Sequence, residues 1–169
     1  YLELLNADKT ESGIKVKAFA VPGKVALWLE DVNKGPNFGS VDEDTIALEI
    51  CNKKTGASFF YIPACAYVPE WLKEKLNNTN LLFFDGTLWT DDEMIKQKVG
   101  IKTGKRMGHI SMSGELWSLN IFKDVKINRK IFIHINTTNP ALLNNSSERK
   151  ILEDAGWEVA YDTMEIKIW

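Results

Sequence analysis

Cysteine is scarce in this sequence: Cys51 and Cys65 are the only two among 169 residues, and they are not in a C-x-x-C spacing. So sparse a pair excludes a disulfide scaffold and favours two reduced thiols in a cytoplasmic protein. Basic residues are not in excess either, because 21 Lys and Arg stand against 23 Asp and Glu, a formal charge of −2. The sequence therefore lacks the excess of positive charge that drives nonspecific binding to nucleic acids, and we expect no nucleic-acid partner.

Long apolar runs are absent as well. Stretches such as residues 81–84 are far shorter than the ~20 residues that a helix needs to cross a bilayer, so we expect no membrane segment. The chain begins with Tyr1 and carries no basic segment followed by an apolar one, which predicts no secretory leader and a piece of a longer protein. Hydrophobic residues (44%) and charged residues (26%) occur in globular proportions, and the length predicts one domain, residues 1–169.

Hydrophobic periodicity predicts an α/β fold. The first third alternates as β-structure does, and further strands follow later in the chain; the expected strands are residues 14–20, 25–30, 45–51, 57–62, 80–84, 130–135, 158–161 and 164–168. Helices are expected from Pro69, near Asp91, around residues 116–122 and after Ser146, whereas residues 100–114 are expected to form a loop. Strands first, then strands alternating with helices, predict a layered α/β protein.

Two buried strands each deliver one polar side chain near their carboxyl end. Asp85 follows the apolar residues 81–84, and His134 lies within the apolar run 131–135. Ligands bind at this edge of α/β sheets, and carboxylate and imidazole groups suit a divalent metal. The alternatives are a simple Asp-Gly turn and a hydrogen-bonded core histidine.

The other histidine, His109, lies in a glycine-rich loop, where it suits a metal-binding or acid/base role; the alternative is a solvated surface histidine. Asp91 and Asp92 place acid at a predicted helix start and are further catalytic candidates. Possible substrate-binding residues are the cations before His109 and the amides after His134, which are Lys102, Lys105, Arg106, Asn136 and Asn139. The alternatives are that the cations only form a solvated charged surface and that the amides only stabilise a turn.

Three segments carry a resemblance to a known family: FFDGTLWTDDEM (83–94), GIKTGKRMGHISMSG (100–114) and IFIHINTTNPALLNNSSERKILEDAGWEVAYDTMEI (131–166). They resemble the PqqB family, which has the metallo-β-lactamase fold and acts in biosynthesis of the redox cofactor pyrroloquinoline quinone (PQQ). The resemblance implies an αββα sandwich with its active site at one edge of the sheets. It also implies that Asp85 is a metal-bridging carboxylate, that His134 is a metal ligand, and that His109 is a catalytic or substrate-contacting histidine.

The sequence departs from the superfamily pattern in one large respect. The HxHxDH ligand cluster is absent, and members are roughly twice this long, so the chain resembles the C-terminal half of the sandwich only. Asp85, His134 and His109 therefore give an incomplete metal set, with iron as the implied metal and zinc as the alternative. We expect little turnover from the isolated chain, and either a homodimer or association with the missing N-terminal half.

Three functions remain open for the family that the chain resembles. The first is iron-dependent, oxygen-using hydroxylation of a tyrosine-derived PQQ precursor, which is an acidic quinone precursor or a peptide-derived substrate. The second is metal-dependent hydrolysis, the commonest chemistry of the fold. The third is non-catalytic carriage or transport of the cofactor by the basic loop.

Overall fold

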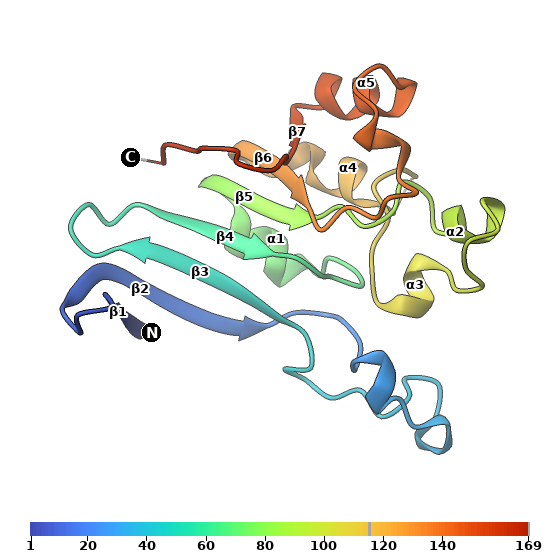
Figure 1. Cartoon of the computed structure of the whole chain (residues 1–169), viewed down its shortest axis with the longest axis horizontal. Coiled ribbons are helices and arrows are strands. Elements are labelled where there is room, and N and C mark those ends of the chain that lie inside the picture. Colours follow the sequence, from blue (N-terminus) through green and yellow to red (C-terminus); the bar gives the residue numbers. More distant parts are fainter. Residues whose placement is uncertain (115, 169) are drawn as a thin grey trace.

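The strands form one mixed sheet whose order follows the sequence (Figure 1). The computed structural model describes residues 1–114 and 116–168. The strands are β1 (Leu2–Leu5), β2 (Glu11–Ala20), β3 (Ile46–Asn52), β4 (Ser58–Ile62), β5 (Thr79–Asp85), β6 (Ile127–Ile133) and β7 (Trp157–Val159). Neighbours from β1 to β4 are antiparallel, and neighbours from β4 to β7 are parallel. The second half of the sheet therefore collects the carboxyl ends of its strands at one edge.

Short helices occupy the connections. They are α1 (Glu70–Leu76), α2 (Glu93–Lys96), α3 (Gly104–Met107), α4 (Ser118–Ile121) and α5 (Ser147–Asp154), with 3₁₀ turns η1 (Leu27–Leu29), η2 (Val32–Lys34), η3 (Phe122–Asp124) and η4 (Pro140–Leu142). Among the described residues, no helix is long and apolar enough to cross a membrane.

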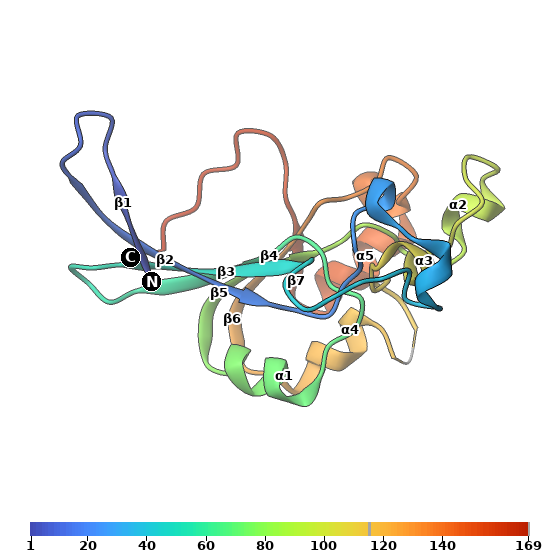
Figure 2. The same cartoon turned by 90° about the horizontal axis from the view of Figure 1, so that it is seen from below.

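The core lies between one face of the sheet and the helices α1 and α4 (Figure 2). Alternate residues along the strands point to this face, because successive side chains of a strand alternate. Phe84 packs edge-on against Phe122 at a ring-centroid distance of 4.9 Å, and Phe132 stacks on Trp157 at 3.9 Å. Leu72 and Leu76 of α1 are fully buried in the same cluster.

The opposite face of the sheet is also apolar but much less covered. Phe59, Tyr61 and Phe83 lie side by side on it, with ring centroids 5.7 and 6.2 Å apart, and Tyr61 is 39% exposed. The segment after β7 and the β1–β2 turn lie on this side of the sheet (Figure 2). One mixed sheet with its helical layer is one half of an αββα sandwich, which confirms the predicted fold class.

Most predicted elements are confirmed, including the hairpin of β3 and β4 and the helix after Pro69. Two predicted strands are wrong. Residues 25–30 contain the 3₁₀ turn η1 instead, and residues 164–168 are irregular. Their apolar residues resemble those of a strand, but a strand forms only where a neighbouring strand offers its backbone groups. The predicted loop 100–114 contains one additional helical turn, α3.

Candidate metal centre

The strands β4, β5 and β6 end at the same edge of the sheet, on the side where α2, α3 and the segment between β2 and β3 lie (Figure 1). Asp85 is the last residue of β5, and His134 follows the last residue of β6. The parallel register pairs Asp85 with Ile133, so the two candidate residues meet at this edge. His109 joins them from the end of α3.

Gly86 lets the two strand ends approach closely. Its N–H donates to the carbonyl of Ile133 at 2.8 Å. A Cβ at this position would lie 2.9 Å from Cβ of Phe132 and 3.1 Å from the Ile133 carbonyl oxygen, both tighter than ordinary contacts. Asn136 donates its N–H to the Thr87 carbonyl at 3.0 Å, which ties the following loops together. Glycine at position 86 is therefore required by the site's geometry.

The backbone also places the two histidines. Gly108 ends α3 in the left-handed conformation (φ 87°), which turns the chain so that the His109 N–H donates to the Gly104 carbonyl at 2.9 Å. His134 itself has φ 55°, an uncommon conformation for a residue with a side chain. The two imidazole rings lie nearly parallel, with centroids 5.2 Å apart. A conformation of this kind at a loop that carries a histidine is typical of a functional site.

Asp85 is completely buried and accepts hydrogen bonds on both carboxylate oxygens. Oδ1 accepts from the Thr87 N–H (3.1 Å) and the Thr87 hydroxyl (2.6 Å). Oδ2 accepts from the Cys65 N–H (3.0 Å) and lies 2.8 Å from Nδ1 of His109. Burial, together with the negative charge of Asp85, raises the pKa of the Cys65 thiol to about 12, so this cysteine stays protonated and unreactive.

Asp85, His109 and His134 each offer one ligand atom, and these atoms lie within 4.8 Å of one another. The structure therefore brings together the three residues that the sequence suggested as metal ligands. One carboxylate and two imidazoles suit zinc and iron. His134 is exposed and His109 is partly exposed, so both rings can be reached from outside.

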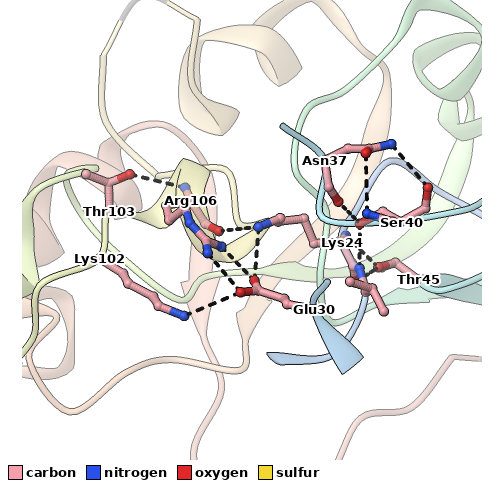
Figure 3. Close-up of polar contacts among 10 residues, drawn as sticks. Lys24, Glu30, Asn37, Ser40, Thr45, Lys102, Thr103 and Arg106 are labelled. Atoms are coloured by element: carbon pink, nitrogen blue, oxygen red, sulfur yellow. Dashed lines mark hydrogen bonds and ion pairs between the residues drawn. The ribbon is translucent and has the colours of Figure 1, made fainter. Parts of the chain in front are cut away.

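The predicted basic loop is partly neutralised by a carboxylate that the sequence analysis did not identify. Arg106 binds both oxygens of Glu30, and Lys24 lies 3.1 Å and Lys102 4.0 Å from the same carboxylate (Figure 3). These hydrogen bonds, chiefly the one from Arg106, lower the pKa of Glu30 to about 2. The guanidinium of Arg106 also stacks 3.8 Å above the ring of Phe38.

The other candidate residues surround the three-residue cluster without joining it. Asp91 accepts from the Lys105 N–H (2.7 Å) at the start of α3, and Asp92 pairs with Lys96 (2.9 Å), which lowers the pKa of Asp92. The Asn136 side chain donates to Thr138 (2.6 Å). Asn139 is buried, and it donates to the Gly86 carbonyl and accepts from the Ala141 N–H. Their catalytic and substrate-binding roles stay predictions.

Thr87 was missed in the sequence analysis. Its hydroxyl contacts all three members of the cluster. A local signal exists, because the carboxylate of an Asp often accepts from the backbone N–H two residues later, as Asp85 does from Thr87. Glu30 has no such signal, since its partner Arg106 is 76 residues away.

Comparison with known proteins identifies the superfamily to which the chain belongs. The family model described as beta-lactamase superfamily domain matches residues 3–135. Coenzyme PQQ synthesis protein B of Bradyrhizobium diazoefficiens is 50% identical over 159 residues, which cover 94% of this chain and 51% of that protein. The crystal structure of Zn²⁺-bound PqqB from Methylobacterium extorquens aligns with a TM-score of 0.83 and 44% identity, over 90% of this chain and 50% of that one.

A more distant likeness concerns the fold alone. Human tRNase Z, short form, aligns with a TM-score of 0.51 at 17% identity, over 94% of this chain and 45% of that one. The chain spans about half the length of the curated relatives it matches. It belongs to the β-lactamase superfamily and, within it, to the PqqB family, of whose members it represents about half.

Proposed function

We propose that this chain forms part of a metal-dependent protein of coenzyme PQQ synthesis. The observation that carries the proposal is the meeting of Asp85, His109 and His134 at the carboxyl edge of β5 and β6. The similarity to coenzyme PQQ synthesis protein B, and the zinc in the related Methylobacterium structure, support it.

His109 and His134 would hold the ion through their ring nitrogens, with Asp85 behind them. The carboxylate of Asp85 already accepts four hydrogen bonds, so it supports a histidine as carboxylates do in carboxylate–histidine–metal arrangements. In this proposal Asp85 acts through His109, whereas the sequence suggested that Asp85 itself binds the metal. A metal ion takes more ligands than two imidazoles. In this proposal the other ligands come from the part of the relatives that this chain does not span.

The metal that we propose is iron, which when bound supplies redox chemistry for oxygen-dependent hydroxylation of a tyrosine-derived precursor. Zinc in the related structure favours a second candidate, metal-dependent hydrolysis, because zinc has no redox chemistry.

In both cases Lys102, Lys105 and Arg106 would bind carboxylates of an acidic quinone precursor. Glu30 already occupies Arg106 and approaches Lys102, so Lys105 is the cation of the three without a carboxylate partner among the described residues.

Anaerobic Fe(II) titration tests the metal proposal. The protein, including the half that this chain does not span, is titrated alongside the variants His134→Ala and Asp92→Ala. We expect His134→Ala to weaken binding by at least about tenfold, whereas Asp92→Ala retains the original affinity because its partner is Lys96. Equal affinity in His134→Ala and the unaltered protein would overturn the proposal.

Oxygen dependence separates the two candidate reactions, since turnover without oxygen favours the hydrolase. A carrier function predicts binding of the acidic quinone that needs no metal, weakens with salt and survives His134→Ala.

We also propose that the apolar sheet face with Phe59, Tyr61 and Phe83 packs against the half of the PqqB fold that this chain does not span. The support is its partial exposure, together with the match to about half of each relative. Without that half, a second copy of the chain is the expected occupant, because a large exposed apolar face is unfavourable in water.

A further inference from the structure

We propose that Thr87 is a positioning residue that fixes which ring nitrogen of His134 carries the proton. The hydrogen bonds of Thr87 are present in the structure without a metal. Only their effect on metal binding rests on the proposed function. Thr87 is 7% exposed, and it is the second residue after β5, which ends at Asp85.

The Thr87 hydroxyl group has a single hydrogen to donate. Oγ1 of Thr87 lies 2.6 Å from Oδ1 of Asp85, 3.0 Å from Nδ1 of His109 and 2.9 Å from Nδ1 of His134. A carboxylate oxygen only accepts, so the Thr87 hydrogen is donated to Asp85. The hydroxyl oxygen has two lone pairs left, and each can accept from one ring N–H. Both histidines therefore carry their proton on Nδ1.

This tautomer leaves Nε2 of each ring unprotonated. An unprotonated ring nitrogen is the form that binds a metal ion, and the hydrogen bond made by the other nitrogen determines which one it is. The Thr87 hydroxyl contacts both imidazoles, and the buried charge of Asp85 orients that hydroxyl.

The two histidines do not depend on Thr87 equally. Nδ1 of His109 has a second acceptor, Oδ2 of Asp85, at 2.8 Å. In the described part of the chain, Nδ1 of His134 has no acceptor besides Thr87. Without the hydroxyl, the proton of His134 is no longer held on Nδ1, whereas Asp85 still holds the proton of His109 on Nδ1. His109 therefore serves as an internal reference.

Nitrogen-15 NMR of the histidine side chains tests the proposal directly, at a pH of about 8 where an ordinary imidazole is neutral. In the unaltered protein we expect both rings as the Nδ1–H form. In Thr87→Val, which keeps the size of the side chain, we expect His134 to shift toward the Nε2–H form and His109 to stay as it is. Thr87→Ser restores the original spectrum, and Thr137→Val, an exposed threonine of the loop after His134, leaves it unchanged.

Two results would overturn the inference: an Nε2–H form of His134 in the unaltered protein, or an unchanged His134 tautomer in Thr87→Val. The first needs no variant, so the test holds even if Thr87→Val does not fold. Zinc titration is the second readout, and we expect Thr87→Val to bind about 10–100-fold more weakly and Thr87→Ser nearly normally.

The two readouts separate this inference from the proposed function. If His134 changes its tautomer in Thr87→Val but the protein binds no metal, the role of Thr87 is supported and the metal proposal is overturned. If Thr87→Val binds zinc normally and His134 keeps its tautomer, the metal proposal is supported and the role of Thr87 is overturned.

Discussion

Arg106 binds both carboxylate oxygens of Glu30, with Nη1 2.6 Å from Oε1 and Nη2 2.8 Å from Oε2. The pair joins the segment between β2 and β3 to α3, the helix that ends two residues before His109. Lys24, from the same segment as Glu30, donates to the Arg106 carbonyl at 3.0 Å. The segment 21–45 is therefore held against the loop of the candidate metal centre by charge.

We predict that Arg106→Lys loosens the segment 21–45, because an ammonium group cannot make the two parallel contacts of a guanidinium. Amide hydrogen exchange at Leu29 and Asp31 should become faster, and the pKa of Glu30 should rise from about 2 toward its usual value. The matched control is Arg149→Lys, in which the lost partner is the exposed Glu153. Unchanged exchange in Arg106→Lys would show that the ion pair does not hold the segment.

The same ion pair predicts a dependence on acid. Because the folded-state pKa of Glu30 is lowered to about 2, its contribution is complete above its usual pKa of 4.5 and is lost as the pH falls toward about 2. Exchange in the segment 21–45 should accordingly accelerate across this range. In Glu30→Gln the segment should already exchange fast at neutral pH and lose this acid dependence. A persistent acid transition in Glu30→Gln would assign it to other carboxylates.

Asp85→Asn tests the buried carboxylate. An amide oxygen can still accept hydrogen bonds, but in either orientation the NH₂ group faces one backbone N–H, that of Cys65 or that of Thr87, and leaves it unpaired. A buried unpaired donor costs about 1–3 kcal/mol, so the free energy of unfolding should fall by about that amount. Urea denaturation measures it, with Asp42→Asn at an exposed residue as the control whose midpoint stays in place. A loss below about 1 kcal/mol would contradict this account.

Gly86→Ala should disturb the junction of β5 and β6. The added methyl group meets Cβ of Phe132 and the Ile133 carbonyl, which belong to the packed strand and cannot move aside. Overpacking of this kind costs about 1–3 kcal/mol, and we expect the strand ends to separate. Denaturation gives the loss of stability, and the NMR signals of His134 report the shift of its loop. A fully stable Gly86→Ala protein with unchanged His134 signals would show that the junction has room to spare.

The apolar face of the sheet predicts self-association of the chain by itself. Light scattering should give a mass above 19.2 kDa, and Tyr61→Lys should shift the mass toward that of one chain, because Tyr61 is 39% exposed on that face. Tyr67→Lys, at an exposed residue outside the sheet, is the control. A well-behaved monomer of the unaltered chain would contradict the expectation.

The sequence predicted the features that depend on local pattern. Residues 81–84 and 130–135 alternate or run apolar as buried strands do, so the positions of Asp85 and His134 at strand ends followed from periodicity. Residues 25–30 carry similar residue types, yet form a 3₁₀ turn with Trp28 84% exposed. A local pattern records which residues favour a strand, and it does not record whether a neighbouring strand is available.

By itself, the sequence determined the family, most of the strands and helices from β3 onward, and the three side chains of the candidate centre. Only the tertiary structure decided their relationships: the carboxylate of Asp85 is saturated with donors, Thr87 links both histidines, and Glu30 neutralises Arg106. The physical reason is that a hydrogen bond or an ion pair forms only when the distance between donor and acceptor is correct to within a few tenths of an ångström. Residues far apart in the chain reach such distances only through the register of the strands that carry them.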